Sequence, residues 1–216
     1  MNIIIAYAAS IAYLILILSI SELTRHLLGG ANEISRKISH IMFSGMWIIW
    51  ITFAWQSIHL IIMPAIGLLL ILAGIKINCL KMLERNGSCD YEGIILYIGL
   101  LLSISILCYF YNPALIPGTF GIFCVAFGDG TAALVGKKLG KYTPKIGQNK
   151  SLAGSLACFF FSLLVMVIIC FCFNQPVCLW KLSILAIITT IVELVGGKFD
   201  NILIGLSVAL CGILLF

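Results

Sequence analysis

Long apolar stretches fill most of the sequence and are separated by shorter polar connections. Eight such stretches can be delimited, at residues 2–20, 41–55, 60–77, 93–110, 114–135, 152–173, 179–195 and 202–216. A helix needs about 17 to 25 residues to cross a bilayer, so the second and the last stretches are short for this role. The stretches lack the alternation of barrel strands, and lipid offers no partners for open backbone groups. The pattern therefore predicts an all-α protein, a polytopic transmembrane bundle of seven or eight helices.

The composition strengthens this interpretation. Of the 216 residues, 62% are hydrophobic and only 10% are charged, and the mean hydropathy is +1.18. A soluble domain carries about 25% charged residues. We therefore expect a single transmembrane catalytic domain, residues 1–216. The first stretch follows no basic segment and is not interpreted as a signal peptide. The nine cysteines form no Cys-x-x-Cys pair, which favours reduced, packed thiols.

The basic residues lie on one side of the predicted bundle. Counted from the N-terminus, the odd-numbered connections are residues 21–40, 78–92, 136–151 and 196–201. They hold, with Lys76 at one edge, every lysine and arginine except Lys181. Basic residues favour cytoplasmic loops, so these connections are predicted to be cytoplasmic and both termini to lie outside. All eight acidic residues fall on the same side. We therefore expect an active site that faces the cytoplasm, at the inner membrane if the cell is bacterial.

The end of the fifth stretch holds the residues of greatest chemical interest. Asp129 lies six residues inside the apolar boundary at Val135, which is about 9 Å along a helix. An ionised carboxylate at that depth is unfavourable and indicates function. Its neighbours are small and leave room for a ligand: Gly128, Gly130, Ala132 and Ala133.

A lysine-rich connection follows Asp129 and ends where the next helix is predicted to begin. Gly136 opens it, and its five lysines are Lys137, Lys138, Lys141, Lys145 and Lys150. Ser151 stands at the start of the next helix. A carboxylate beside lysines and a helix N-terminus suits a polyphosphate bound to Mg²⁺ or another divalent cation. The acid holds the metal, while lysines and free N–H groups neutralise phosphate oxygens.

Simpler explanations apply to the same residues. Small residues beside an acid are also typical of close helix packing. A lysine-rich cytoplasmic loop also serves as a topology signal or contacts lipid headgroups. The P-loop pattern GxxxxGK[ST] does not occur in the sequence.

Two further polar clusters lie on the predicted cytoplasmic side. In the first, Glu33, Lys37 and His40 share one face of a helix, as do Arg36 and His40. An interfacial helix with snorkelling bases is the alternative interpretation. In the second, Glu193 precedes a Gly196-Gly197 break that lets Asp200 and Asn201 turn back toward Asp129. Asp200 or Asn201 is otherwise a candidate N-cap of the last helix.

Three blocks in this order resemble the membrane-bound CTP-dependent lipid kinases, the family that includes phytol kinase and dolichol kinase. The blocks are Arg36-Lys37-x-x-His40, Gly128-Asp129-Gly130-x-Ala132 to Lys150-Ser151-x-x-Gly154-Ser155, and Glu193 to Asp200-Asn201. The resemblance covers most of the chain from about Glu22, and its central block is the specific part.

The resemblance implies transfer of the γ-phosphate of CTP to the hydroxyl group of a membrane isoprenoid alcohol, with a divalent metal. It implies four catalytic residues, Asp129, Lys150, Glu193 and Asp200, of which Asp129 and Asp200 hold the metal. Glu193 or Asp200 would orient or deprotonate the alcohol. The residues expected to bind the nucleotide are Gly128, Gly130, Gly136, Lys137, Lys138, Lys141, Ser151, Arg36, Lys37, His40 and Asn201.

The sequence leaves two other functions open. The central block is also similar to phosphatidate cytidylyltransferases, whose Lys-[Ser/Thr]-x-Glu-Gly step has an acid where this chain has Ala153. A small ion-coupled transporter is a weaker alternative, because transporter sites lie near the midplane of repeats. The acceptor stays open among phytol, geranylgeraniol, farnesol, a polyprenol and diacylglycerol. We expect no nucleic-acid partner, and the oligomeric state is left open.

The predicted orientation can be tested with single cysteines introduced into a chain whose native cysteines have been replaced. A membrane-impermeant thiol reagent is expected to label Asn174→Cys in intact cells. Lys141→Cys and Asn86→Cys should react only after permeabilisation, because their connections carry the basic residues that favour the cytoplasm. Labelling of Lys141→Cys from outside intact cells would reverse the predicted orientation.

Overall fold

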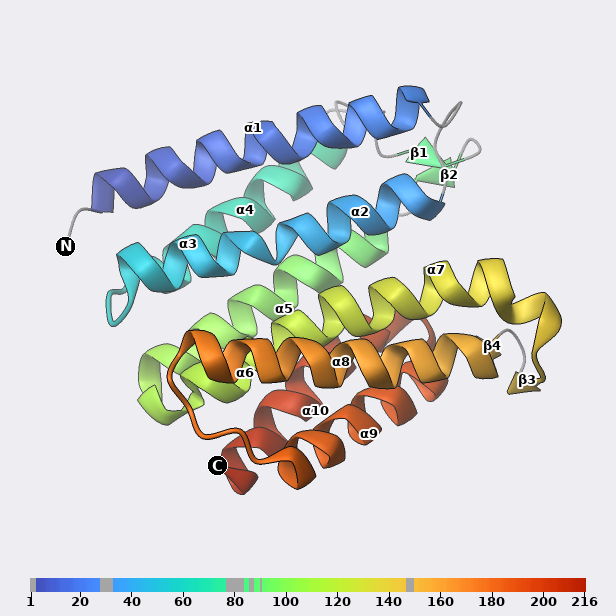
Figure 1. Ribbon diagram of the computed structural model, residues 1–216. Coiled ribbons are helices and arrows are strands. Elements are labelled where there is room, and N and C mark those ends of the chain that lie inside the picture. Colours follow the sequence, from blue (N-terminus) through green and yellow to red (C-terminus); the bar gives the residue numbers. More distant parts are fainter. Residues whose placement is uncertain (1–2, 28–32, 77–83, 86–87, 90, 147–149) are drawn as a thin grey trace. The chain divides into compact units, whose positions relative to one another are not determined.

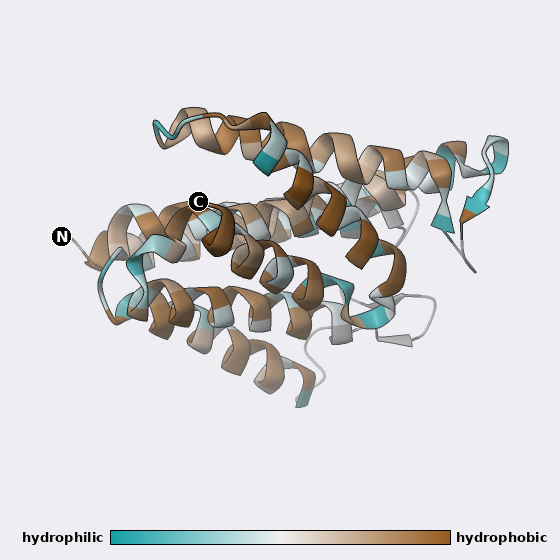
Figure 2. Cartoon of the chain, turned by 90° about the horizontal axis from the view of Figure 1, so that it is seen from below, coloured by the Kyte–Doolittle hydropathy of each residue, from teal (hydrophilic) through white to brown (hydrophobic). Residues whose placement is uncertain are grey.

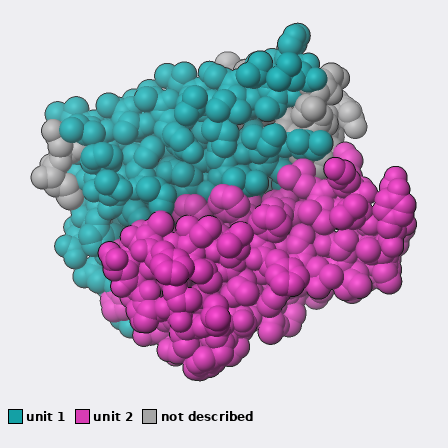
Figure 3. Space-filling view, in the orientation of Figure 1, with its two compact units in different colours: residues 1–112 teal, residues 113–216 magenta. Residues whose placement is uncertain are grey.

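Helices make up almost all of the described chain (Figure 1), as the apolar pattern predicts. The computed structural model describes residues 3–27, 33–76, 84–85, 88–89, 91–146 and 150–216. It divides the chain into two compact units, Met1–Asn112 and Pro113–Phe216 (Figure 3). The expected single catalytic domain stays a prediction, and each unit is described by itself.

The first unit contains five helices and a two-residue hairpin among its described residues. They are α1 (Ile3–Leu27), α2 (Glu33–Phe43), α3 (Gly45–Ala54), α4 (His59–Lys76), β1 (Glu84–Arg85), β2 (Ser88–Cys89) and α5 (Tyr91–Phe110). Polar side chains attach α1 to α2 and α3. The Tyr13 hydroxyl donates to the Met42 carbonyl at 2.9 Å, and Trp50 Nε1 donates to Ser10 Oγ at 3.0 Å. Most of the predicted connection at 78–92, including Asn86, lies outside the described residues.

The second unit begins with one long, locally irregular span and continues with three helices. Its elements are α6 (Leu115–Phe123), the π-helical segment η3 (Cys124–Asp129), α7 (Gly130–Leu139), η4 (Gly140–Tyr142), β3 (Lys145–Ile146), β4 (Lys150–Ser151), α8 (Leu152–Cys172), α9 (Leu179–Val195), η5 (Gly197–Phe199) and α10 (Asp200–Leu215). Its core is apolar, with fully buried side chains that include Phe120, Met166, Leu185 and Ile204.

Seven of the described helical segments are long and apolar enough to cross a membrane. They are Ile3–Thr24, Lys37–Ala54, His59–Lys76, Gly93–Phe110, Asn112–Tyr142, Leu152–Cys172 and Gly197–Leu215. Apolar residues cover these helices, and hydrophilic residues gather in the connections (Figure 2). The prediction of an all-α bundle with seven or eight spans is therefore confirmed, and the outside position of the N-terminus stays a prediction.

Helix α9 accounts for the difference between the seven candidate spans and the eight apolar stretches of the sequence. It has 17 residues, or about 25 Å of helix, which is at the lower limit for a span. Near its start, Lys181 Nζ donates to the Leu215 carbonyl at the end of α10. Near its end, Glu193 pairs with Lys150, just before α8. Helix α9 thus runs antiparallel to both α8 and α10.

Candidate functional site

A π-helical segment places Asp129 inside the second unit. The segment Cys124–Asp129 interrupts the helical run from α6 to α7, and Asp129 is its last residue. Such segments add a residue to one turn and occur frequently at functional sites. The Thr131 hydroxyl donates to the carbonyls of Phe127 and Gly128, at 2.6 and 3.2 Å. Asp129 is only 3% exposed, so its carboxylate lies within the protein interior.

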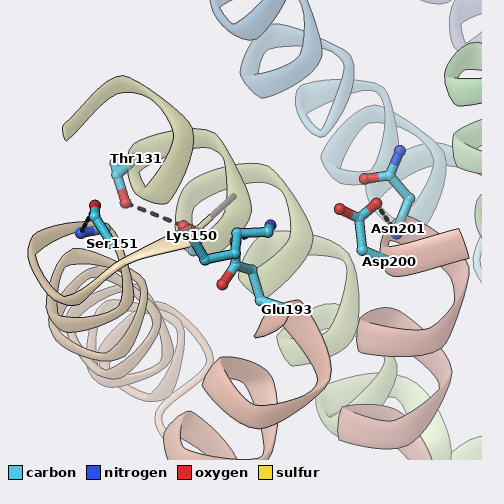
Figure 4. A network of polar contacts seen from close by, with 8 residues as sticks. Thr131, Lys150, Ser151, Glu193, Asp200 and Asn201 are labelled. Atoms are coloured by element: carbon cyan, nitrogen blue, oxygen red, sulfur yellow. Dashed lines mark hydrogen bonds and ion pairs between the residues drawn. The ribbon is translucent and has the colours of Figure 1, made fainter. Parts of the chain in front are cut away.

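Lys150 reaches the same region from a short hairpin. Strand β4 pairs with β3, with Ile146 opposite Lys150. Ser151 is the N-cap of α8, and its hydroxyl accepts the Gly154 N–H at 3.2 Å. The Lys150 ammonium forms an ion pair and hydrogen bond with Glu193 Oε1 on α9 (Figure 4). The Lys150 side chain is 32% exposed and that of Glu193 is 3% exposed.

Three carboxylates act on Lys150. Its burial disfavours the charged form and by itself lowers the pKa of Lys150. The hydrogen bond and charge of Glu193, with smaller contributions from Asp129 and Asp200, outweigh that effect and raise the pKa of Lys150 above its ordinary value. Lys150 is therefore charged at neutral pH. Lys150 therefore interacts electrostatically with the other three predicted catalytic residues, Glu193, Asp129 and Asp200.

The predicted helix break after Glu193 is confirmed. Helix α9 ends at Val195, and Gly197 adopts a left-handed conformation with φ +56°, which favours glycine. Helix α10 begins at Asp200, whose Oδ1 accepts the Asn201 N–H at 2.8 Å. The N-cap position itself is Phe199, so the alternative that placed Asp200 or Asn201 there is wrong.

The N-terminus of α8 differs from expectation. The sequence predicts that the first N–H groups of α8 are free to bind phosphate. This prediction is wrong, because the N–H groups of the first turn already have acceptors within the protein. Leu152 N–H donates to the Pro144 carbonyl at 3.0 Å, and Ala153 N–H to the Thr143 hydroxyl at 3.4 Å. Gly154 N–H donates to its cap, as described above. The hairpin that carries Lys150 therefore uses the N–H groups that the sequence assigns to phosphate.

Close helix packing explains several of the predicted glycines. A Cβ atom on Gly128 would lie 2.3 Å from Ser162 Oγ, and one on Gly154 would lie 2.9 Å from the Ala132 carbonyl oxygen. A Cβ on Gly136 would lie 3.3 Å from Ser151 Oγ. Gly130 is buried. The roles of Gly128, Gly130, Gly136 and Ser151 in nucleotide binding stay predictions.

The remaining predicted nucleotide-binding residues have different surroundings. Lys137, Lys138 and Lys141 are exposed near the end of α7 and in η4. Arg36, Lys37 and His40 lie on α2, in the first unit, where Lys37 is buried and the His40 ring packs on Tyr97 with centroids 4.4 Å apart. Because they belong to the other unit, their part in the site stays a prediction.

Sequence reasoning missed Ser155 as a candidate. It lies one turn after Ser151 on α8 and is 7% exposed, and its hydroxyl has no hydrogen-bond partner in the described part of the chain. The sequence signal was its place in the Lys150-Ser151-x-x-Gly154-Ser155 step.

The acidic residues can supply only part of the coordination shell of Mg²⁺. Among the described residues, no group of three or more His, Cys, Asp or Glu side chains is placed to hold a metal ion. Mg²⁺ usually binds one or two carboxylates together with waters and substrate phosphates. Asp129 and Asp200, which both act on Lys150, suit that smaller share of the coordination shell.

Comparison with known proteins connects the chain to one family and to several lipid kinases. A model described as the Cytidylyltransferase family matches residues 1–201. A probable phytol kinase of Oryza sativa is 26% identical over 207 residues, covering 86% of this chain and 65% of the rice protein. The phytol kinase of Arabidopsis thaliana is 24% identical over 223 residues, covering 93% and 72%.

A shorter match has higher identity. The CTP-dependent diacylglycerol kinase of Saccharomyces cerevisiae is 34% identical over 79 residues, which is 36% of this chain. That match spans a quarter of the length of the yeast kinase. No solved structure matches the chain.

The ion pair between Lys150 and Glu193 can be tested by removing each partner and then both. Lys150→Met and Glu193→Gln should each lower the free energy of unfolding by about 1–3 kcal/mol, because the remaining charge is left unpaired. This is less than for a fully buried pair, because water partly screens Lys150. The double variant should recover part of the loss, measured by thermal unfolding in detergent. The exposed Lys145→Met serves as control and should change little, whereas strictly additive losses in the double variant would contradict the pairing.

Proposed function

The chain belongs to the cytidylyltransferase family, and we propose that it is a CTP-dependent kinase that phosphorylates the hydroxyl group of a membrane isoprenoid alcohol. The two plant phytol kinases support this assignment, because they align with 86% and 93% of the chain. The diacylglycerol kinase of yeast supports CTP as the phosphoryl donor.

The observation that carries the proposal is the charged Lys150, which is paired with Glu193 (Figure 4) and is further stabilised by the charges of Asp129 and Asp200. Lys150 is anchored by Glu193 yet one third exposed, so its ammonium is available to an incoming phosphate. Because the first N–H groups of α8 are occupied, lysine side chains supply the positive charge for the triphosphate. Lys137, Lys138 and Lys141 are exposed and suit the rest of the nucleotide.

Catalysis in this arrangement rests on positioning and on charge neutralisation. Asp129 and Asp200 would hold a divalent cation, whose positive charge would offset that of the phosphates. Lys150 binds the transferred phosphoryl group, and its ion pair with Glu193 fixes where its ammonium lies. Glu193 or Asp200 orients the alcohol. The alcohol chain stays in the lipid while its hydroxyl reaches the end of the bundle, on the face that we assign to the cytoplasm.

The second candidate activity is cytidylyl transfer to phosphatidic acid, which the name of the matching family favours. Against it, Ala153 occupies the position where the resembling cytidylyltransferase motif has an acid. Both reactions use a metal and basic residues, so the identity of the products separates them.

The proposal is tested by following the two labels of CTP with purified protein, Mg²⁺ and a panel of lipids. With γ-labelled CTP and an isoprenoid alcohol, we expect a labelled lipid phosphate and release of CDP. With α-labelled CTP, the lipid should stay unlabelled, because a kinase breaks the bond between the β- and γ-phosphates. Pyrophosphate release and an α-labelled lipid formed from phosphatidic acid would overturn the kinase assignment.

Asp129→Asn tests the carboxylate assigned to the metal. It keeps the size of the side chain and removes its charge, so turnover should fall by about a hundredfold or more. The variant should still insert into the membrane and purify, and its unfolding midpoint should stay near that of the wild type. Activity within a few-fold of the wild type would show that Asp129 serves packing instead.

A further inference from the structure

Glu193 Oε2 and Ser155 Oγ are both buried, and neither has a hydrogen-bond partner among the residues that the structure describes. Only one oxygen of the Glu193 carboxylate is used by Lys150. Buried polar groups in native proteins are nearly always hydrogen-bonded, so an unpaired carboxylate oxygen and an unpaired hydroxyl indicate a missing ligand or water. Ser155 and Glu193 are both more than nine-tenths buried.

The register of α8 and α9 brings these two residues to the same level. The helices are antiparallel, and Thr189 Cγ2 on α9 and Cys158 Sγ on α8 lie 3.3 and 3.4 Å from the position that a Cβ atom on Gly128 would take. Ser155 precedes Cys158 by three residues, and Glu193 follows Thr189 by four residues. Residues three or four apart share a helix face, so Ser155 and Glu193 lie one turn nearer to Lys150, on faces that meet the same part of η3.

The outward-facing sides of α8 and α9 near these two residues are apolar. On α8, Leu152 and Leu156 are exposed. On α9, Ile191 and Val195 are exposed on the side of the helix opposite the buried Glu193. A ligand that extends from the outside of these helices to Ser155 and Glu193 therefore needs a polar group at its tip and an apolar chain behind it.

We propose that Glu193 Oε2 and Ser155 Oγ bind the hydroxyl group of the acceptor alcohol. The proposal rests on the kinase activity proposed above and adds the place where the nucleophile sits. The hydroxyl donates its hydrogen to Glu193 Oε2 and accepts one from Ser155. Because Glu193 Oε1 holds Lys150, one carboxylate then positions both the nucleophile and the lysine that binds the phosphoryl group.

The transfer step balances within this arrangement. The alcohol oxygen forms a bond to the γ-phosphorus, and the bond from that phosphorus to the β,γ-bridging oxygen breaks. The bridging oxygen leaves with the electron pair as part of CDP. The alcohol proton passes to Glu193 Oε2, which releases it to water after the products have left and before the next alcohol binds. The same role suits Asp200 less well, because it is partly exposed and its Oδ1 accepts the Asn201 N–H. Burial of Glu193 also disfavours water as a competing acceptor.

The test compares Ser155→Ala with Ser162→Ala in the full chain, reconstituted in lipid bilayers. Ser162 is a matched control, because it is a buried serine on the same helix, two turns further from Lys150. The KM values for the alcohol and for CTP are measured separately, with phytol and with diacylglycerol as acceptors. Ser155→Ala should raise the KM for the accepted alcohol by about tenfold, the usual effect of losing one such hydrogen bond. The KM for CTP should not change.

Glu193→Gln provides the second variant and should lower alcohol phosphorylation by about a hundredfold or more, because it removes the carboxylate that orients the hydroxyl and holds Lys150. Ser162→Ala should stay within about twofold of the wild type for both substrates. Thermal unfolding in the same bilayers verifies that each variant is folded.

The outcomes separate this inference from the proposed function. If the wild type releases CDP and Ser155→Ala matches Ser162→Ala in its KM for the alcohol, the kinase assignment stands and the hydroxyl site is wrong. A rise in the KM for CTP alone in Ser155→Ala would also contradict the site. If the wild type instead releases pyrophosphate with phosphatidic acid, both proposals fall together, because that acceptor attacks through a phosphate oxygen.

Discussion

A carboxylate buried near the end of a membrane bundle needs a positive partner, and this requirement organises the second unit. Glu193 is almost fully buried on α9, where an unpaired charge is strongly unfavourable. Lys150 supplies that partner from a hairpin 43 residues earlier in the chain. The pair joins the start of α8 to the end of α9 and fixes their antiparallel register. It also places Lys150 near Asp129 and Asp200, whose charges help to keep it protonated.

Close backbone packing makes this arrangement possible. Ser162 occupies the space where a side chain on Gly128 would lie, and the Ala132 carbonyl approaches Gly154. These contacts hold α8 against η3 and α7, which follow one another in a single span. The π-helical segment adds a residue at that point and leaves Asp129 at its end. The acid, the lysine and the start of α8 thus meet because small residues allow three elements to approach closely.

The sequence predicts the local features of this structure and misses the non-local ones. The long apolar runs give the helices because lipid leaves the backbone no other partner. The helix start at Ser151 and the break at Gly197 follow from capping and from glycine's left-handed conformation. The ion pair of Lys150 and the π-helical segment depend on contacts between distant residues. The occupied N–H groups of α8 were also unpredictable, because the Thr143-Pro144 turn that binds them folds back from an irregular connection.

The chemistry of the two acceptors bears on the choice between kinase and cytidylyltransferase. Phosphatidic acid attacks through an anionic phosphate oxygen, which is repelled by a buried carboxylate oxygen without a partner. An alcohol is neutral, and in the proposed site its hydroxyl would donate a hydrogen bond to Glu193 Oε2, which has no partner among the described residues. Since Glu193 Oε1 is already used by Lys150, the free oxygen is directed to a donor. A site that pairs a charged lysine for phosphate with an unpaired carboxylate oxygen for a donor therefore favours an alcohol as nucleophile.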